Sequence, residues 1–294
     1  MPEGAFSGPS CGWRRTLSRV IAGLNRALLC SPPGRALRAH VERAIDVEER
    51  VLQLPSAAPA LHTLRLAWIS DLHAGHVLGE DELARLLARV AALEPELVCL
   101  GGDLINTDPR EAELLRRPLR ELSAPLGVWA VPGNHDYFCG PELAGWTDAL
   151  EDSGVRVLHN AGARIERAGA SFWLAGVDDL IEGRPDLERA LEGRAEGEPV
   201  LLLAHNPDFF HESGSAGIEL TLSGHTHAGQ IRVGGWSPMV HSELGFVEGV
   251  YSDGDARLFV GRGVGVTVLP FRWGTRGEVA LLELAAPGPQ SSPV

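Results

Sequence analysis

Residues 64–73 read LRLAWISDLH and place an aspartate and a histidine directly after a short apolar run. Such a run is typical of a buried β-strand. The same arrangement recurs after four other apolar runs, at residues 97–100, 128–131, 200–203 and 218–222. The polar segments that follow them are GGD (101–103), GNHD (133–136), AHN (204–206) and SGHTH (223–227). We therefore expect carboxylate, imidazole and amide groups to gather at one edge of a sheet, where they suit metal ions.

The order of the elements predicts an α/β fold. From residue 64 onward, strands alternate with helices expected over 81–93, 109–122 and 141–153, which indicates βαβ units. The second of these helices has Asp108 as its N-cap and Pro109 at its first position. After residue 154 the strands become shorter and more frequent. We expect two mixed sheets packed face to face, with helices outside.

Composition limits the possible functions. A chain of 294 residues fits one α/β domain with additional segments, and its net charge of −13 argues against nucleic acid as a partner. All 26 basic residues are arginine, so a P-loop or a Schiff-base lysine is excluded. The four cysteines show no CxxC spacing, which favours a reducing compartment over a disulfide framework.

The N-terminal part is expected to be separate from this domain. Residues 1–60 are predicted as a basic helical segment that ends in an Ala/Pro-rich linker, and its second helix is expected to run to about residue 53. Residues 1–40 contain six arginines against one acidic residue, a local net charge of 6 − 1 = +5. The composition of residues 285–294 predicts a disordered tail.

The apolar stretch at 17–29 leaves two interpretations open. Arg19, Asn25 and Arg26 interrupt it, and it is shorter than the ~20 residues that a membrane span requires. It is either a basic amphipathic helix on an anionic membrane or a helix that is solvated or packs on the domain. No signal-peptide pattern follows the arginines. We expect a cytoplasmic protein, with peripheral contact at the inner membrane face as one alternative.

Two of the polar segments supply candidate ligands from the first half of the chain. Asp71 and His73 are two residues apart, so in an extended segment both reach the same ion. The alternative is a capping aspartate beside a surface histidine. Asp103 follows two glycines that allow close approach of the backbone, which suits a carboxylate shared by two cations, although GGD is equally a turn.

The remaining segments add an amide and several imidazoles. Asn134 is a candidate ligand, and the adjacent His135 points elsewhere and is free to handle protons, unless the segment is a simple turn. His205 ends a strand and is either a ligand or a core histidine. His225 and His227 alternate along an extended stretch, and two imidazoles on one face are a strong metal-binding pattern.

Taken in order, DxH, GD, GNHD, a lone His and GHxH resemble the calcineurin-like metallophosphoesterase superfamily over about residues 64–283. The longer strings WISDLHAGH, VPGNHDYF and LSGHTHAGQI look like the bacterial branch of membrane-associated phosphohydrolases. The resemblance implies a four-layer α/β/β/α sandwich, with the metallophosphoesterase domain at 61–284.

The resemblance also implies two divalent metal ions, which in this family are Mn, Fe or Zn. The first would be bound by Asp71, His73, Asp103 and His227. The second would be bound by Asp103, Asn134, His205 and His225. The implied reaction is attack of a metal-bridging hydroxide on a phosphodiester or pyrophosphate. His135 would be the catalytic residue that protonates the leaving oxygen or stabilises the phosphorane-like transition state.

One position departs from the family pattern. Many relatives read GDxxD and orient the catalytic histidine with the second aspartate, whereas this chain has Asn106 there. Acid catalysis is expected to be weaker unless Asp108 or Asp136 takes over. A lipid-linked nucleotide sugar is one predicted substrate. The alternatives are a phosphomonoesterase and a metal-binding pseudoenzyme that acts as an interaction module.

Overall fold

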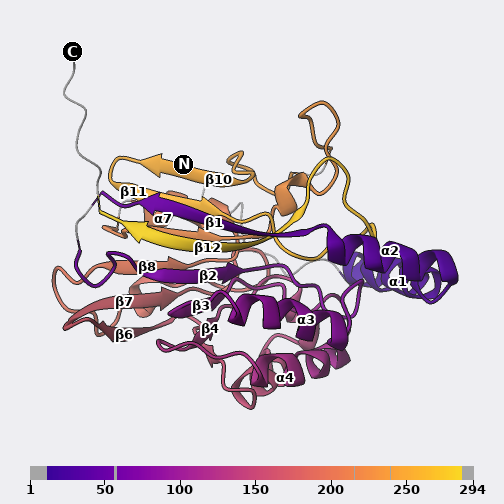
Figure 1. The fold of residues 1–294 in the computed structure, drawn as a ribbon, viewed down its shortest axis with the longest axis horizontal. Coiled ribbons are helices and arrows are strands. Elements are labelled where there is room, and N and C mark those ends of the chain that lie inside the picture. The colour runs from indigo at the N-terminus through magenta and orange to yellow at the C-terminus, as the bar shows by residue number, and fades with distance from the viewer. Residues whose placement is uncertain (1–11, 56–57, 215, 239, 287–294) are drawn as a thin grey trace.

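Two six-stranded mixed sheets pack face to face in the computed structural model, which describes residues 12–55, 58–214, 216–238 and 240–286 (Figure 1). The first sheet contains, in spatial order, β1 (Ile45–Gln53), β12 (Gly277–Ala285), β2 (Arg65–Ile69), β3 (Leu97–Leu100), β4 (Val128–Ala130) and β5 (Arg156–Val157). The second contains β10 (Gly249–Asp253), β11 (Ala256–Val260), β9 (Leu220–Ser223), β8 (Val200–Leu203), β7 (Ala170–Gly176) and β6 (Ala161–Arg167). The predicted architecture of two mixed sheets is confirmed.

Helices cover both outer faces of this pair of sheets. The α-helices are α1 (Gly12–Leu29), α2 (Pro32–Arg43), α3 (Glu80–Ala91), α4 (Glu113–Arg120), α5 (Ala144–Glu151), α6 (Leu187–Ala190) and α7 (Phe210–Ser213). The 3-10 helices are η1 (Pro109–Ala112), η2 (Asp136–Cys139), η3 (Pro207–Phe209) and η4 (His227–Gly229). Helices α3, α4 and α5 pack on the first sheet, and residues of α6 and η3 pack on the second. The predicted four layers are present.

The alternation of side chains along the strands builds two separate cores. In β2, Leu66 and Trp68 point between the sheets, whereas Ala67 and Ile69 point toward α3, α4 and α5. This follows from the two-residue period of a strand. Because both faces are buried, some central strands are apolar throughout, as in LVCL of β3 and VLLL of β8. These continuous apolar runs are what made the strands predictable.

The predicted helix over 109–122 forms as two shorter helices, η1 and α4. The Asp108 side chain accepts a hydrogen bond from the backbone N–H of Arg110, as expected of an N-cap. Glu111 completes the capping box and accepts from the backbone N–H groups of Asn106 and Thr107 as well. The start of this segment therefore fixes the loop that follows β3.

The expectation of a helix up to residue 53 is wrong. The helix ends at Arg43, and Ile45–Gln53 is the strand β1, which pairs in parallel with β12. Its charged residues face partners on and near β12, since Arg50 pairs with Glu278 at 2.7 Å and Asp46 pairs with Arg276 at 2.9 Å. The first sheet thus includes residues from the segment predicted to be separate.

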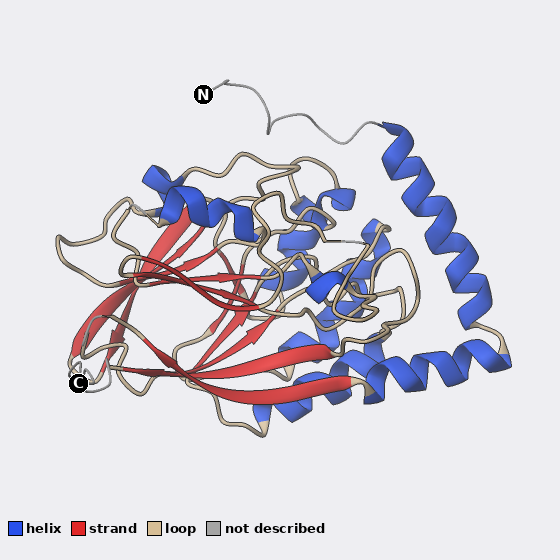
Figure 2. Cartoon of the chain, turned by 90° about the horizontal axis from the view of Figure 1, so that it is seen from above, coloured by secondary structure: helices blue, strands red, loops and turns tan. Residues whose placement is uncertain are grey.

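Helices α1 and α2 lie together at one end of the molecule (Figures 1 and 2). Leu29 at the end of α1 is buried in a small apolar cluster with Val41, Val77 and Val266. Within the described residues, no helix is long and apolar enough to cross a membrane. Of the predicted linker, residues 56–57 lie outside the described residues. So does most of the predicted tail, although β12 includes Ala285.

Candidate metal centre

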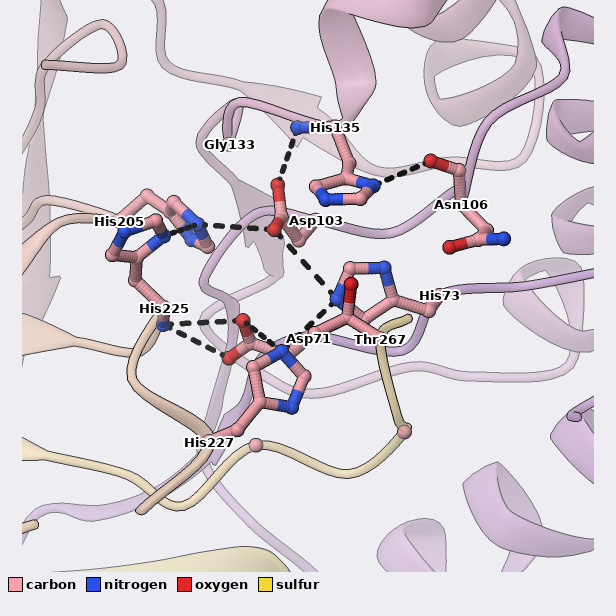
Figure 3. Close-up of polar contacts among 12 residues, drawn as sticks. Asp71, His73, Asp103, Asn106, Gly133, His135, His205, His225, His227 and Thr267 are labelled. Atoms are coloured by element: carbon pink, nitrogen blue, oxygen red, sulfur yellow. Dashed lines mark hydrogen bonds and ion pairs between the residues drawn. The ribbon is translucent and has the colours of Figure 1, made fainter. Parts of the chain in front are cut away.

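Loops from both sheets bring six of the seven predicted ligands together: Asp71, His73, Asp103, His205, His225 and His227 (Figure 3). All of these residues lie after the carboxyl end of a strand. The loops after β2, β3 and β4 of the first sheet carry Asp71, His73, Asp103 and Asn134. The loops after β8 and β9 of the second sheet carry His205, His225 and His227. The site therefore spans the two sheets at one end.

Asp71, His73 and His227 form a first cluster of possible metal ligands. The Nε2 atom of His227 lies 3.4 Å from Oδ1 of Asp71 and 3.1 Å from Nε2 of His73. One ligand atom from each of the three residues lies within 4.8 Å of the others. All three side chains are buried. Nitrogen and oxygen donors therefore converge on one point inside the protein.

Asp103, His205 and His225 form a second cluster. The Nε2 atom of His205 lies 3.4 Å from Oδ2 of Asp103 and 3.2 Å from Nδ1 of His225. The other ring nitrogen of His205, Nδ1, lies 2.7 Å from the carbonyl oxygen of Gly101. A hydrogen bond from Nδ1–H to this carbonyl leaves the lone pair of Nε2 facing the cluster, which is the arrangement of a metal-binding histidine.

The carboxylate of Asp103 lies between the two clusters. Its Oδ2 atom, which is near His205, is also 3.7 Å from Nε2 of His73 in the first cluster. Its Oδ1 atom accepts a 2.7 Å hydrogen bond from the backbone N–H of His135. One carboxylate thus reaches both groups of donors, as a ligand shared by two cations must.

The electrostatics of the centre favour cations. Burial holds the pKa of three imidazoles well below the usual value, so they are neutral donors: His73, His225 and His227. Burial and the nearby carboxylate of Asp103 together raise the pKa of Asp71 to about 6. Burial lowers the pKa of His205, but the carboxylates of Asp71 and Asp103 outweigh this effect and raise it well above its usual value. The negative charge of these carboxylates therefore favours positively charged groups at the centre.

The backbone of the centre is unusually strained. Five of the seven candidate ligands have positive φ angles, a region that residues with side chains seldom adopt. They are Asp71 (56°), His73 (44°), Asp103 (52°), His225 (68°) and His227 (51°). Such conformations cost free energy and cluster at functional sites. The strain is therefore a second sign, independent of residue type, that these loops serve a site.

Gly133 and Asn134 lie on the loop after β4, and Gly133 is in close contact with the second cluster. A Cβ atom on Gly133 would collide with the carboxylate of Asp103 and approach the ring of His205 to 2.9 Å. A residue with a side chain therefore does not fit at position 133 without displacing these neighbours. The Oδ1 atom of Asn134 is buried and has no hydrogen-bond partner among the described residues. An unpaired buried acceptor is costly, and a cation at this position would satisfy it.

Comparison with known families agrees with this geometry. The family model described as calcineurin-like phosphoesterase matches residues 64–229, which is more than half of the chain. The chain belongs to this phosphoesterase family. Every candidate ligand lies within the matched range, whereas helices α1 and α2 and strand β1 lie outside it.

Several relatives carry names of the same phosphoesterase family. A transmembrane protein with metallophosphoesterase domain from Danio rerio is 33% identical over 84% of this chain and 58% of its own length. The Bos taurus protein of that name is 34% identical over 82% of this chain and 56% of its own length. The chain thus spans little more than half of these two relatives. The uncharacterized metallophosphoesterase YkuE of Bacillus subtilis is 28% identical over 92% of this chain and 96% of its own length.

Two solved structures are similar to this phosphoesterase at low sequence identity. The phosphopantetheinyl hydrolase of Mycobacterium tuberculosis gives a TM-score of 0.42 at 16% identity and covers 78% of this chain and 98% of its own. A dimetal phosphatase of Danio rerio gives a TM-score of 0.43 at 13% identity and covers 69% of this chain and 88% of its own.

His135 of this phosphoesterase stands at the edge of the two clusters. Its ring packs edge-on against that of His73, with 4.6 Å between the centroids. Its Nδ1 atom lies 2.5 Å from the backbone carbonyl oxygen of Asn106. The ring also forms a third group of possible ligands with His73 and Asp103. Its position therefore permits two roles, proton transfer or metal binding.

The group that orients the ring of His135 is neither of the two aspartates predicted to do so, Asp108 and Asp136. Asp136 points away from the ring and accepts hydrogen bonds from the backbone N–H groups of Leu104 and Gly133. Asp108 caps η1 instead. The ring instead hydrogen-bonds to the carbonyl of Asn106, which orients the imidazole but carries no full charge. The prediction that Asp108 or Asp136 takes over is not supported.

The sequence marks Arg272 as either a group that grips a phosphate or carboxylate or a surface residue, but this arginine is buried behind the centre. Arg272 donates hydrogen bonds to the carbonyl oxygens of His227 and Gly265 at 2.9 and 3.0 Å, and its Nη2 atom lies 3.2 Å from Nδ1 of His227. Burial lowers the pKa of Arg272 to about 10. An arginine after a glycine-rich stretch gave no signal of this role. The residue holds the backbone and the ring of a candidate ligand.

Proposed function

We propose that the protein is a two-metal phosphohydrolase that cleaves a phosphodiester or pyrophosphate bond. The observation that carries this proposal is the position of Asp103, whose carboxylate reaches both clusters of buried donors. Paired metal ions that share a ligand are the usual catalysts of displacement at phosphorus. Membership of the phosphoesterase family supports the same reaction class.

The proposed ligands follow from the two clusters. The first ion would be held by Asp71, His73, Asp103 and His227. The second would be held by Asp103, Asn134, His205 and His225. This mixture of carboxylate, amide and imidazole donors suits Mn²⁺, Fe or Zn²⁺. When bound, the ions supply Lewis acidity and an activated water as nucleophile.

His135 is the proposed acid. With Nδ1–H donated to the carbonyl of Asn106, the Nε2–H group remains to give its proton to the leaving oxygen. A carbonyl stabilises a positive imidazole less than a carboxylate does, because it carries only a partial charge. We therefore expect slow turnover of substrates with poor leaving groups.

We also propose that α1 brings the site to a membrane surface, at the cytoplasmic face. Four large apolar residues on α1 are 48–69% exposed: Leu17, Val20, Leu24 and Leu28. Their spacing of three and four residues places them on one side of the helix. The net charge of +5 over residues 1–40 suits anionic lipid. The names of two relatives, which call them transmembrane proteins, agree with such a location. A lipid-linked nucleotide sugar stays a prediction.

The enzymatic proposal is tested with metal-stripped full-length protein. We expect two Mn²⁺ ions to bind per chain and to restore hydrolysis of bis(p-nitrophenyl) phosphate. Asp103→Asn keeps the shape of the side chain but removes its charge, so both binding and hydrolysis should collapse. Hydrolysis of p-nitrophenyl phosphate but not of bis(p-nitrophenyl) phosphate would favour the phosphomonoesterase. Two bound ions without turnover of either compound would favour the interaction module.

The membrane proposal is tested by co-sedimentation with vesicles of phosphatidylglycerol and phosphatidylcholine. Leu24→Asp places a charge in the exposed stripe of α1 and should reduce pelleting at least fivefold. Val51→Asp is the matched control, because Val51 is similarly exposed, at 67%, but lies on β1. Equal pelleting of both variants and the parent protein would contradict membrane contact through α1.

A further inference from the structure

A small cavity lies between helix α1 and the proposed acid His135. It measures about 70 Å³. Ser18, Ile21 and Ala22 of α1 line one part of it, and Thr107, His135 and Val268 line others. The cavity therefore joins a helix outside the matched family region to the residue that we place at the leaving oxygen.

Helix α1 is anchored beside this cavity by specific contacts. The side-chain amide of Asn25 donates a 2.6 Å hydrogen bond to the carbonyl oxygen of Val268. The guanidinium of Arg19 lies 5.8 Å from the centroid of the Phe138 ring, which in turn lies 5.7 Å from the His135 ring. These contacts tie the helix to the loop that carries His135. The α1 wall is thus a built part of the site.

The lining of the cavity suits a particular kind of group. Ile21, Ala22 and Val268 give it aliphatic surface. Hydroxyl-bearing residues, Ser18 and Thr107 among them, give it hydrogen-bonding surface. A group that combines carbon chain with hydroxyls matches both kinds of surface. The volume is several times the roughly 10–15 Å³ that one water needs, so a few non-hydrogen atoms fit but a nucleobase must extend outside.

The charge of the cavity argues against a second phosphate. None of the residues that line it is an arginine, and the chain contains no lysine. The arginines on the loops after β11 have other partners, since Arg262 pairs with Glu48 and Arg276 pairs with Asp46. A pyrophosphate would place a second charged group here, where the imidazoles of His76 and His135 are the only side chains of the lining that can carry positive charge.

We propose that this cavity is the leaving-group subsite and takes a short hydroxylated alkyl alcohol such as glycerol. The inference rests on the proposed function and makes the substrate a phosphodiester. Water forms a new P–O bond and releases a proton, the bond from phosphorus to the alcohol oxygen breaks, and that oxygen takes a proton from Nε2 of His135. The proton released by the water restores the protonated His135. The products are a phosphate monoester and the free alcohol.

The test is calorimetric binding to the Mn²⁺-loaded full chain, which does not depend on turnover. Glycerol 1-phosphate should bind about tenfold more tightly than methyl phosphate, a difference of about 1.4 kcal/mol. Ala22→Trp fills the cavity and should abolish the difference, while inorganic phosphate binds as before. Leu24→Trp, the same change on the exposed side of α1, should preserve it. Ser18→Ala is a milder variant and should reduce it severalfold.

Equal affinities for glycerol 1-phosphate and methyl phosphate would overturn the inference. A preference that survives in the Ala22→Trp variant would also overturn it, as would a preference for pyrophosphate that this variant removes. Hydrolysis of bis(p-nitrophenyl) phosphate in the parent protein separates the two proposals. Activity without a glycerol preference rejects only the subsite. A preference without activity rejects the proposed function and leaves a binding site for polyol phosphates.

Discussion

Replacing His135 by alanine should separate catalysis from metal binding. The backbone N–H of residue 135 donates the 2.7 Å hydrogen bond to Asp103, and alanine keeps this group. The shared carboxylate therefore stays in place when the imidazole is removed. We expect His135→Ala to bind two Mn²⁺ ions per chain with affinity close to that of the parent protein.

The loss of rate in this variant should depend on the leaving group. Removing a general acid costs about 10²- to 10⁴-fold, or about 2.7–5.5 kcal/mol of transition-state stabilisation. An alkyl alcohol needs the proton to leave, so the rate of hydrolysis of its diesters should fall by a factor in this range. p-Nitrophenolate leaves readily without a proton, so hydrolysis of bis(p-nitrophenyl) phosphate should fall by about tenfold or less. The ratio of the two losses is the diagnostic quantity.

The assay combines steady-state rates on both kinds of diester with metal content by atomic spectroscopy. His62→Ala is the control, because His62 is exposed and lies away from the centre. Equal losses on both substrates would refute the acid role. A drop to one metal ion would instead show that His135 is a ligand, as its contact with His73 and Asp103 allows.

Three further predictions follow from contacts in and around the centre. Gly133→Ala pushes a methyl group into the carboxylate of Asp103, so metal content should fall below two ions per chain while circular dichroism is unchanged; a full complement of metal would count against the steric argument. Tyr137→Phe removes the 2.5 Å hydrogen bond to Asp178, which should lower the free energy of unfolding by about 1–3 kcal/mol in urea titrations, and a change under about 0.5 kcal/mol would contradict it. Mn²⁺ at a hundred times its dissociation constant should raise that free energy by about 2.7 kcal/mol for each ion bound to the parent protein. Asp103→Asn should show no such gain.

Much of the fold was predictable because the central strands are buried on both faces. Runs such as residues 200–203 are apolar throughout and stand out in the sequence. Strand β1 was not predictable in this way. Its residues Asp46, Glu48 and Arg50 alternate along the strand, but their partners lie more than 200 residues away in the sequence. Without those partners, the segment resembles a charged helix.

The composition of the site was predictable for a similar reason. Polar residues directly after buried strands must lie at the end of the sheet, so the gathering of Asp71, Asp103 and His205 follows from their positions. The partner of His135 was not predictable, because a backbone carbonyl exists at every position and has no signature in the sequence. The contacts of the inner side of α1 were not predictable either, since an amphipathic pattern does not show which residues pack against each face.

The position of β12 within the first sheet constrains the order of folding. β12 lies between β1 and β2, which are consecutive strands separated by eleven residues along the chain. On the ribosome, β1 therefore has to wait until residues 277–285 have emerged, because β12 is its neighbour in the sheet. Until then the edges of β1 and β2 are both open to wrong pairing. Fragments that stop before residue 277 should therefore aggregate rather than form a smaller version of the domain.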